Sequence, residues 1–256
     1  MQKLRFLYEM RLNFSQPIQK QYFSLRCLPK NTVRQKLYNH KLLVEPCDGF
    51  LLQNDGLGNC VCFGRSMDWH DSFLFSSSGV VWIDDCKYET DYKLLYTCCS
   101  PYTKMNRELT EWSQYLSLPE DRLKKAEQIM HEVNGLLTYK SGSTDIYTTA
   151  VQAFLQREGV CQDYAHIMLA LCRYQGIPAR YAAGIILGEG FTHAWVEVYI
   201  DGCWQGLDPT NDCYADNTYI KLADGRDYGD CLVDRGIFCG NAVQQQSVYV
   251  NVEVIR

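Results

Sequence analysis

The sequence predicts an α+β fold in which an all-β region is followed by a region of mixed helices and strands. Apolar residues occupy every second position from Leu4 to Phe14, which is the period of a half-buried strand. Short apolar runs separated by turn-rich pieces continue to about residue 100. Helical patterns take over after Ser100-Pro101. With 256 residues, the chain is long enough for one large or two modest domains.

Several further strands are expected in the first hundred residues. They lie at 22–27, 41–44, 60–63, 73–75, 80–83 and 93–97. Turn-forming pieces at 54–59 and 76–79 separate them. Many short strands with such punctuation are typical of a small antiparallel sandwich or barrel. We therefore expect residues 1–100 to form an N-terminal β-sandwich or barrel-like domain.

Helices are expected once this β pattern ends. The patterns cover residues 109–116, 120–134 and 148–157. Pro119 suits the start of the second helix, and Gly135 suits its end. We place a domain boundary near residue 100, so that residues 101–256 form the second domain.

Composition and charge narrow the classes of function. The net charge of −5 and the absence of a Lys/Arg cluster argue against nucleic-acid and anionic-membrane partners. No apolar run reaches the roughly 18 residues of a spanning helix. The first residues lack the apolar core of a signal peptide, so we expect a cytoplasmic location.

The cysteines predict neither disulfides nor a metal site. Thirteen scattered thiols in a chain without an export signal are typical of small core residues in a reducing compartment. Cys60 and Cys62, like Cys98 and Cys99, lack the paired gaps that zinc sites use. We expect no metal and no cofactor.

Cys161 is the first candidate for chemistry. The segment from Tyr164 to Tyr174 is almost wholly apolar, which predicts a helix buried on nearly all sides, and Cys161 lies at its N-terminal edge. A helix N-terminus carries about half a positive charge and unpaired N–H groups. Both favour a thiolate, and the N–H groups can also hold an oxyanion. The alternative is an inert buried thiol.

His193 and Asp208 are expected to meet across a hairpin. Asp201-Gly202 is a strong signal for a two-residue turn. A hairpin closed there sets Trp195 opposite Asp208, and Asp208 then lies one diagonal step from His193 on the same face. A carboxylate beside imidazole fixes its tautomer and stabilises the imidazolium. Taken alone, His193 could be structural and Asp208 a turn residue before proline.

Four motifs resemble the transglutaminase-like superfamily of papain-like thiol enzymes. They are Gly-Val-Cys-Gln-Asp-Tyr-Ala-His at 159–166, Gly-Ile-Pro-Ala-Arg-Tyr at 176–181, His-Ala-Trp-Val-Glu-Val at 193–198 and Asp-Pro-Thr-Asn at 208–211. The resemblance implies a papain-like core, with the buried cysteine helix packed on an antiparallel sheet. It implies that Cys161 is the nucleophile, His193 the general base and acid, and Asp208 the residue that orients His193. Residues 1–100 resemble the N-terminal domain found in bacterial members.

The predicted activity is that of a thiol-dependent amide hydrolase, a cysteine peptidase or amidase acting on a peptide or protein amide through a thioester. Related bacterial sequences often have Arg after the nucleophile, where this chain has Gln162. The tryptophan that serves as oxyanion donor in animal transglutaminases has no counterpart before Cys161, which favours hydrolysis. A transglutaminase-type acyl transferase and a catalytically silent binding module stay open as alternatives, as does the oligomeric state.

Other polar and aromatic residues of these motifs have expected supporting roles. Asp163 is expected to cap the helix or hold a neighbouring loop, and His166 to be a hydrogen-bonded core histidine. Asn211 is expected to brace the loop after Asp208. Trp195 is expected to shield the imidazole or line the cleft, and Glu197 to face solvent or a covering loop.

Overall fold

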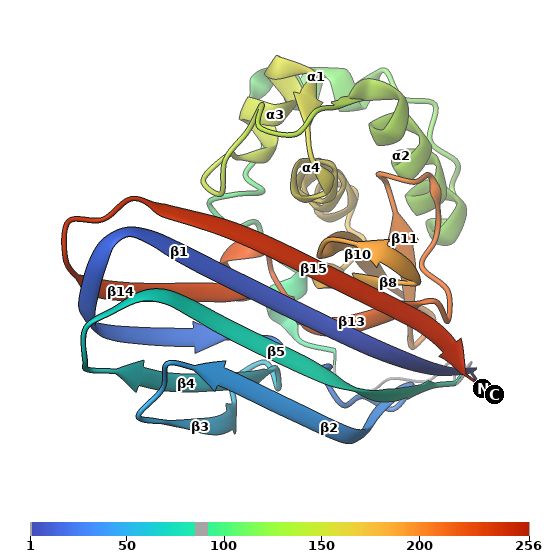
Figure 1. Ribbon diagram of the computed structural model, residues 1–256. Coiled ribbons are helices and arrows are strands. Elements are labelled where there is room, and N and C mark those ends of the chain that lie inside the picture. The colour runs from blue at the N-terminus through green and yellow to red at the C-terminus, as the bar shows by residue number, and fades with distance from the viewer. Residues whose placement is uncertain (1, 85–91, 256) are drawn as a thin grey trace.

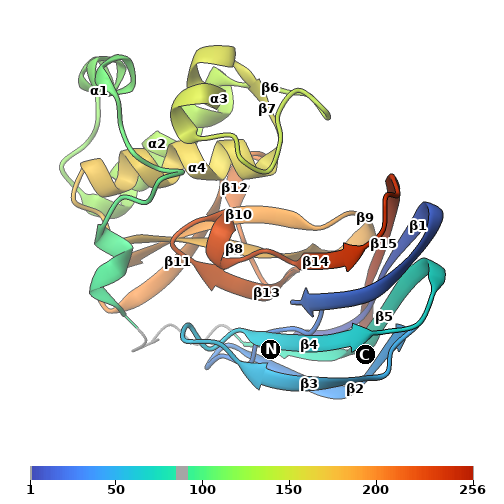
Figure 2. The same cartoon turned by 90° about the vertical axis from the view of Figure 1, so that its left-hand side faces the viewer.

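A computed structural model describes residues 2–84 and 92–255, and the fold is α+β, as predicted (Figures 1 and 2). The first sheet contains β1 (Gln2–Leu25), β2 (Gln35–Glu45), β3 (Gly49–Asn54), β4 (Cys60–Ser66), β5 (His70–Ile83), β9 (Gly188–Gly190), β14 (Asp234–Cys239) and β15 (Gln244–Ile255). Its strands pair antiparallel. Within the described residues, no helix is long and apolar enough to cross a bilayer.

Strand β1 organises the first sheet. Its first half pairs with β5 and β15, and its second half pairs with β4 and β14. The predicted alternation from Leu4 to Phe14 is confirmed, because every second side chain is buried. Those side chains form one wall of the core between this sheet and the next.

The end of the chain returns to the first sheet. Strand β15 lies between β1 and β9, and Lys3 pairs with Ile255. The boundary near residue 100 stays a prediction, but the two sheets do not divide the chain there, since β14 and β15 pair with β1. The predicted strand at 93–97 is wrong. Residues Leu94–Thr97 form a 3₁₀ turn (η1) that buries Tyr96 edge-on against Trp204.

The second sheet carries the candidate site and has the order β12-β11-β10-β8-β13. Its strands are β8 (Ala179–Ile186), β10 (His193–Ile200), β11 (Cys203–Asp208), β12 (Cys213–Tyr214) and β13 (Tyr219–Gly225). The helices are α1 (Arg107–Gln114), α2 (Arg122–Leu136), α3 (Ala150–Gln156) and α4 (Cys161–Tyr174). The short strands β6 (Thr138–Tyr139) and β7 (Glu158–Gly159) pair in parallel, and a 3₁₀ turn, η2, covers Tyr228–Asp230.

The second sheet is the middle of three layers. On one face of the second sheet, side chains such as Val196 and Leu207 pack against helix α4 (Figures 1 and 2). On the other face, Ile185, Ile220 and Leu222 pack against the first sheet. The predicted buried helix is confirmed. It begins three residues before the predicted start, so that Cys161 is its first residue.

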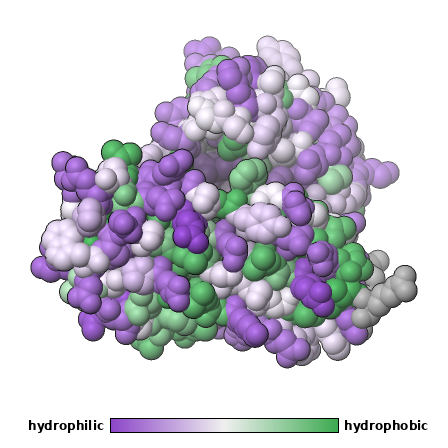
Figure 3. Space-filling view, in the orientation of Figure 1, coloured by the Kyte–Doolittle hydropathy of each residue, from purple (hydrophilic) through white to green (hydrophobic). Residues whose placement is uncertain are grey.

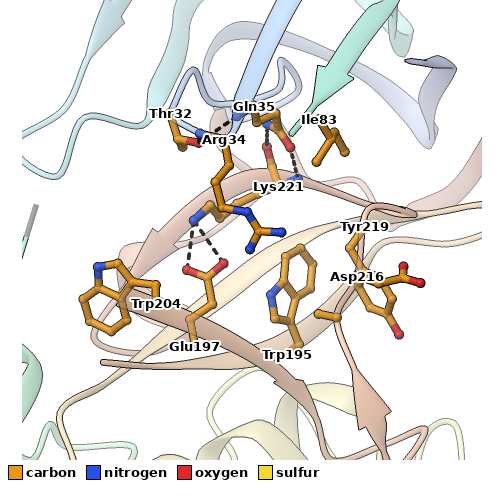
Figure 4. Close-up of a pocket in the computed structure, with 11 residues that line it drawn as sticks. Thr32, Arg34, Gln35, Ile83, Trp195, Glu197, Trp204, Asp216, Tyr219 and Lys221 are labelled. Carbon is orange, nitrogen blue, oxygen red and sulfur yellow. Dashed lines mark hydrogen bonds and ion pairs between the residues drawn. The ribbon is translucent and has the colours of Figure 1, made fainter. Parts of the chain in front are cut away.

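Buried ion pairs connect strands of the second sheet and tie that sheet to the segment that follows β1. Lys30 Nζ lies 2.8 Å from Asp224 Oδ2, and Arg180 Nε lies 2.6 Å from Glu197 Oε2. Figure 4 shows Lys221 reaching the same Glu197 carboxylate, at 2.9 Å. Glu197 is thus not solvent-facing. Burial disfavours its charged form, but Arg180 and Lys221 outweigh burial and lower the pKa of Glu197 to about 2.

We predict that Glu197→Gln destabilises the protein by about 3–5 kcal/mol at pH 7, because it leaves buried cations undercompensated. The ionic contribution is present above the ordinary pKa of 4.5 and is lost as pH falls toward 2, so the deficit should shrink in acid. Urea unfolding measures it. Glu111→Gln is the matched control, since Glu111 forms an exposed pair with Arg107 and should cost less than about 1 kcal/mol. Equal losses in the two variants would contradict the prediction.

Candidate active site

Cys161 is held at the start of α4 by a tight local structure. Val160 is the N-cap, and its N–H donates to Asp163 Oδ2 at 2.8 Å. Thr144 Oγ1 donates to the same oxygen at 2.7 Å, so Asp163 both caps the helix and holds a neighbouring loop, as expected. Position 159 requires glycine, because an added Cβ would lie 2.7 Å from Asp163 Cβ. The half-buried Cys161 thiol therefore sits at the positive end of the helix.

The hairpin brings His193 to Asp208. Asp201 and Gly202 have φ values of 51° and 82°, as a two-residue turn with positive φ at both centres requires. The register that this turn predicts is confirmed, because Ile200 pairs with Cys203 and Tyr199 with Trp204. His193 begins β10, Asp208 ends β11, and His193 Nε2 lies 2.7 Å from Asp208 Oδ2.

Asp208 is fully buried and hydrogen-bonded on both oxygens. Oδ2 accepts from Tyr219 Oη at 2.9 Å and from Asn211 Nδ2 at 2.7 Å, and Oδ1 accepts from the Thr210 N–H at 2.9 Å. Asn211 thus braces Asp208, as expected. Burial opposes the ionised form, but hydrogen bonds from His193, Tyr219 and Asn211 outweigh it and keep the pKa of Asp208 below its usual range. A fixed carboxylate therefore faces the imidazole.

The imidazole of His193 also reaches Cys161. Burial would lower the pKa of His193, but hydrogen bonds with Asp208 and with the Cys161 thiol outweigh burial and raise the pKa to about 9. Asp208 engages Nε2, so Nδ1 is the ring nitrogen that is left for the thiol. The structure thus brings together the three residues that the sequence nominated. An imidazolium held between a thiol and a carboxylate is suited to nucleophilic chemistry.

A cleft of about 470 Å³ opens beside His193. Phe191 and Tyr139 contribute aromatic walls to it. Tyr139 is about half exposed and pairs with Gly159, two residues before the nucleophile candidate. Burial and the nearby Cys161 thiol raise the pKa of Tyr139, so its phenol stays protonated and can donate a hydrogen bond. No local sequence pattern marks Tyr139, because only the parallel pairing of β6 with β7 brings it to the site.

Tyr219 is the second residue that sequence analysis missed. Its strand, β13, pairs with β8, so its approach to Asp208 depends on the sheet order and not on local spacing. Trp195 packs edge-on against Tyr219 with ring centroids 5.4 Å apart, and the Tyr219 ring lies 6.2 Å from that of His193. Trp195 therefore supports the imidazole through Tyr219.

His166 lies outside the triad arrangement. It is fully buried, and its Nε2 accepts from the Tyr228 N–H at 3.2 Å. Burial lowers the pKa of His166 to about 3, so the ring is neutral near pH 7. The prediction of a hydrogen-bonded core histidine is confirmed.

Two family models match separate parts of the chain. Residues 110–209 match the Transglutaminase-like superfamily, and residues 4–82 match the Bacterial transglutaminase-like N-terminal region. An uncharacterised protein of Mycobacterium tuberculosis is 28% identical over 265 residues, covering 89% of this chain and 84% of the relative. An uncharacterised protein of Mycobacterium leprae is 31% identical over 161 residues, covering 59% of this chain and 57% of the relative.

One solved structure shares the whole architecture. The crystal structure of a candidate cysteine protease from Cytophaga hutchinsonii superimposes with a TM-score of 0.85 at 23% identity, covering 100% of this chain and 91% of the other. At that identity the likeness concerns the fold. Cys161, His193 and Asp208 lie within the matched core, and Thr210, Asn211 and Tyr219 lie just beyond it. The chain thus combines a transglutaminase-like core with a bacterial transglutaminase-like N-terminal region.

Proposed function

We propose that the protein is a thiol-dependent amide hydrolase in which Cys161, His193 and Asp208 act as the catalytic triad. The observation that carries the proposal is the placement of His193, which is hydrogen-bonded to the buried Asp208 and lies close enough to the Cys161 thiol for the thiol to raise its pKa. The transglutaminase-like core and the fold shared with a candidate cysteine protease support the coarser assignment to cysteine enzymes.

The reaction proceeds through a thioester. The Cys161 thiolate attacks the carbonyl carbon of an amide and forms the S–C bond. The C–N bond then breaks, and the His193 imidazolium gives its proton to the leaving amine. Water next attacks the thioester carbon while His193 takes a proton from it, and the acid leaves as the thiolate and imidazolium are restored. Asp208 holds the ring and stabilises its charged form.

Two groups are suited to hold the oxyanion. Cys161 is the first residue of α4, so its backbone N–H has no acceptor within the helix. The Tyr139 phenol faces the same cleft as His193 and lies near the thiol. Tyr139 thus takes the part of the side-chain donor for which the sequence offered no tryptophan.

The direct test lets water and a primary amine compete for the thioester formed on Cys161. We incubate the protein with a glutamine-containing peptide and a labelled primary amine, and follow acid release and amine incorporation by mass spectrometry. We expect release of free acid, with Cys161→Ala inactive in both channels. Incorporation without free acid would contradict hydrolysis and favour the acyl-transferase alternative. If neither free acid nor an amine adduct forms with any of a range of amide peptides, the result would favour a silent binding module.

The alkaline limb of the pH profile of kcat/KM should follow the deprotonation of His193. With a pKa of about 9, the imidazolium is present below that pH and is lost as pH rises through it, so kcat/KM should fall there. Asp208→Asn removes the charge that raises this pKa, so the limb should move to lower pH. Asp71→Asn, at an exposed carboxylate on β5, should leave it in place. An unmoved limb in Asp208→Asn would rule out this coupling.

Tyr139→Phe should reduce kcat/KM by about 10²–10³-fold, the usual effect of losing one oxyanion donor. The rate of Cys161 alkylation by iodoacetamide should be unchanged, since alkylation forms no oxyanion. Steady-state kinetics and alkylation of the same two proteins separate the outcomes. If kcat/KM and the alkylation rate of Cys161 fell by the same factor, Tyr139 would position the thiol and would not stabilise the oxyanion.

A further inference from the structure

A second and larger cleft, which we call the tyrosine cleft, lies between the helical part of the molecule and the first sheet. Its volume is about 800 Å³. Apolar side chains of the first sheet face phenols from the catalytic part across it: Phe23, Phe73 and Ile237 on one side, and Tyr102, Tyr147 and Tyr228 on the other. In Figure 3 the surface is hollowed where these two parts of the molecule meet.

A loop that lines the tyrosine cleft is bonded to the residue after Cys161. Gln162, the next residue, donates from Nε2 to the Asp145 carbonyl at 3.4 Å, at the base of the loop that carries Tyr147. Tyr228 packs edge-on against Tyr181 with ring centroids 6.5 Å apart. Burial raises the pKa of Tyr181, and the adjacent Cys161 thiol raises it further. Contacts made by Gln162 and Tyr181 thus link the surroundings of Cys161 to residues that line this cleft.

One carboxylate, that of Asp234, lies among the apolar and phenolic side chains of the tyrosine cleft. Asp234, the first residue of β14, accepts one hydrogen bond from Gln246 Nε2 at 3.1 Å. Across the described chain, no Lys or Arg forms an ion pair with it; Arg235 also lines the cleft but is exposed. Burial raises the pKa of Asp234, and its charge influences the phenols of Tyr8 and Tyr228. A partly buried carboxylate without a cation gains most from a ligand that brings one.

We propose that the tyrosine cleft binds a substrate segment that carries a primary ammonium group among apolar side chains, with Asp234 as the ammonium acceptor. A lysine side chain fits this description. Its methylenes can pack on the aromatic walls, and its ammonium group can meet the carboxylate beside electron-rich rings. The inference rests on the proposed amide hydrolase and names the class of substrate that this enzyme would select.

The test measures binding without chemistry, in the Cys161→Ala protein. The probes are acetyl-Phe-Lys-Phe-amide and the same peptide with norleucine in place of lysine, titrated by calorimetry at pH 7. We expect the lysine peptide to bind at least about tenfold more tightly. Asp234→Asn should abolish the preference, Asp234→Glu should retain part of it, and the exposed control Asp71→Asn should leave it whole.

Each outcome decides the proposal. Equal affinities, no binding of either peptide, or a preference that survives Asp234→Asn would overturn it. Asp234→Asn is expected to fold, because a carboxyl with a raised pKa lowers stability when it is charged. If the lysine preference is found but the wild-type protein hydrolyses no amide, the hydrolase proposal is overturned and the binding proposal stands.

Discussion

The burial of α4 is the constraint on which the rest of the structure depends. Every residue from Gln162 to Arg173 is buried, so the helix cannot shift without exposing apolar surface on several sides. The second sheet packs against one side of α4, and helices α2 and α3 pack against its other sides. This fixes the first residue, Cys161, in front of His193. A thiol at a rigid helix terminus is thereby positioned before any substrate arrives.

The first sheet is a structural part of the site. Strand β9 pairs with β15, and it immediately precedes the segment that leads to His193. Gln35 exchanges hydrogen bonds with the backbone of Lys221, and the buried Lys30–Asp224 ion pair crosses the same interface. Removing the N-terminal region would expose one face of the second sheet and take Lys30 away from the buried Asp224. The N-terminal region therefore holds the second sheet in place and supplies one wall of the tyrosine cleft.

What could be predicted from sequence was local. The alternation in β1, the apolar run of α4 and the Asp201-Gly202 turn each carry their information within a few residues, and the turn alone sets the register that joins His193 to Asp208. The contributions of Tyr139 and Tyr219 depend on pairings between distant strands, which no short pattern encodes. The same holds for the return of β15 to β1 and for the burial of Glu197, whose cationic partners lie on other strands.

The most direct measurement is the site-resolved rate of iodoacetamide alkylation at pH 6, read by peptide mass spectrometry. Burial raises the pKa of Cys62 and Cys172 to about 12, so these thiols should react very slowly. We expect Cys161 to react faster than every other thiol, including the exposed Cys98, and to lose this advantage in His193→Ala. If Cys161 reacts no faster than Cys98, or reacts equally fast without His193, the thiolate–imidazolium pair does not exist and the proposed mechanism fails.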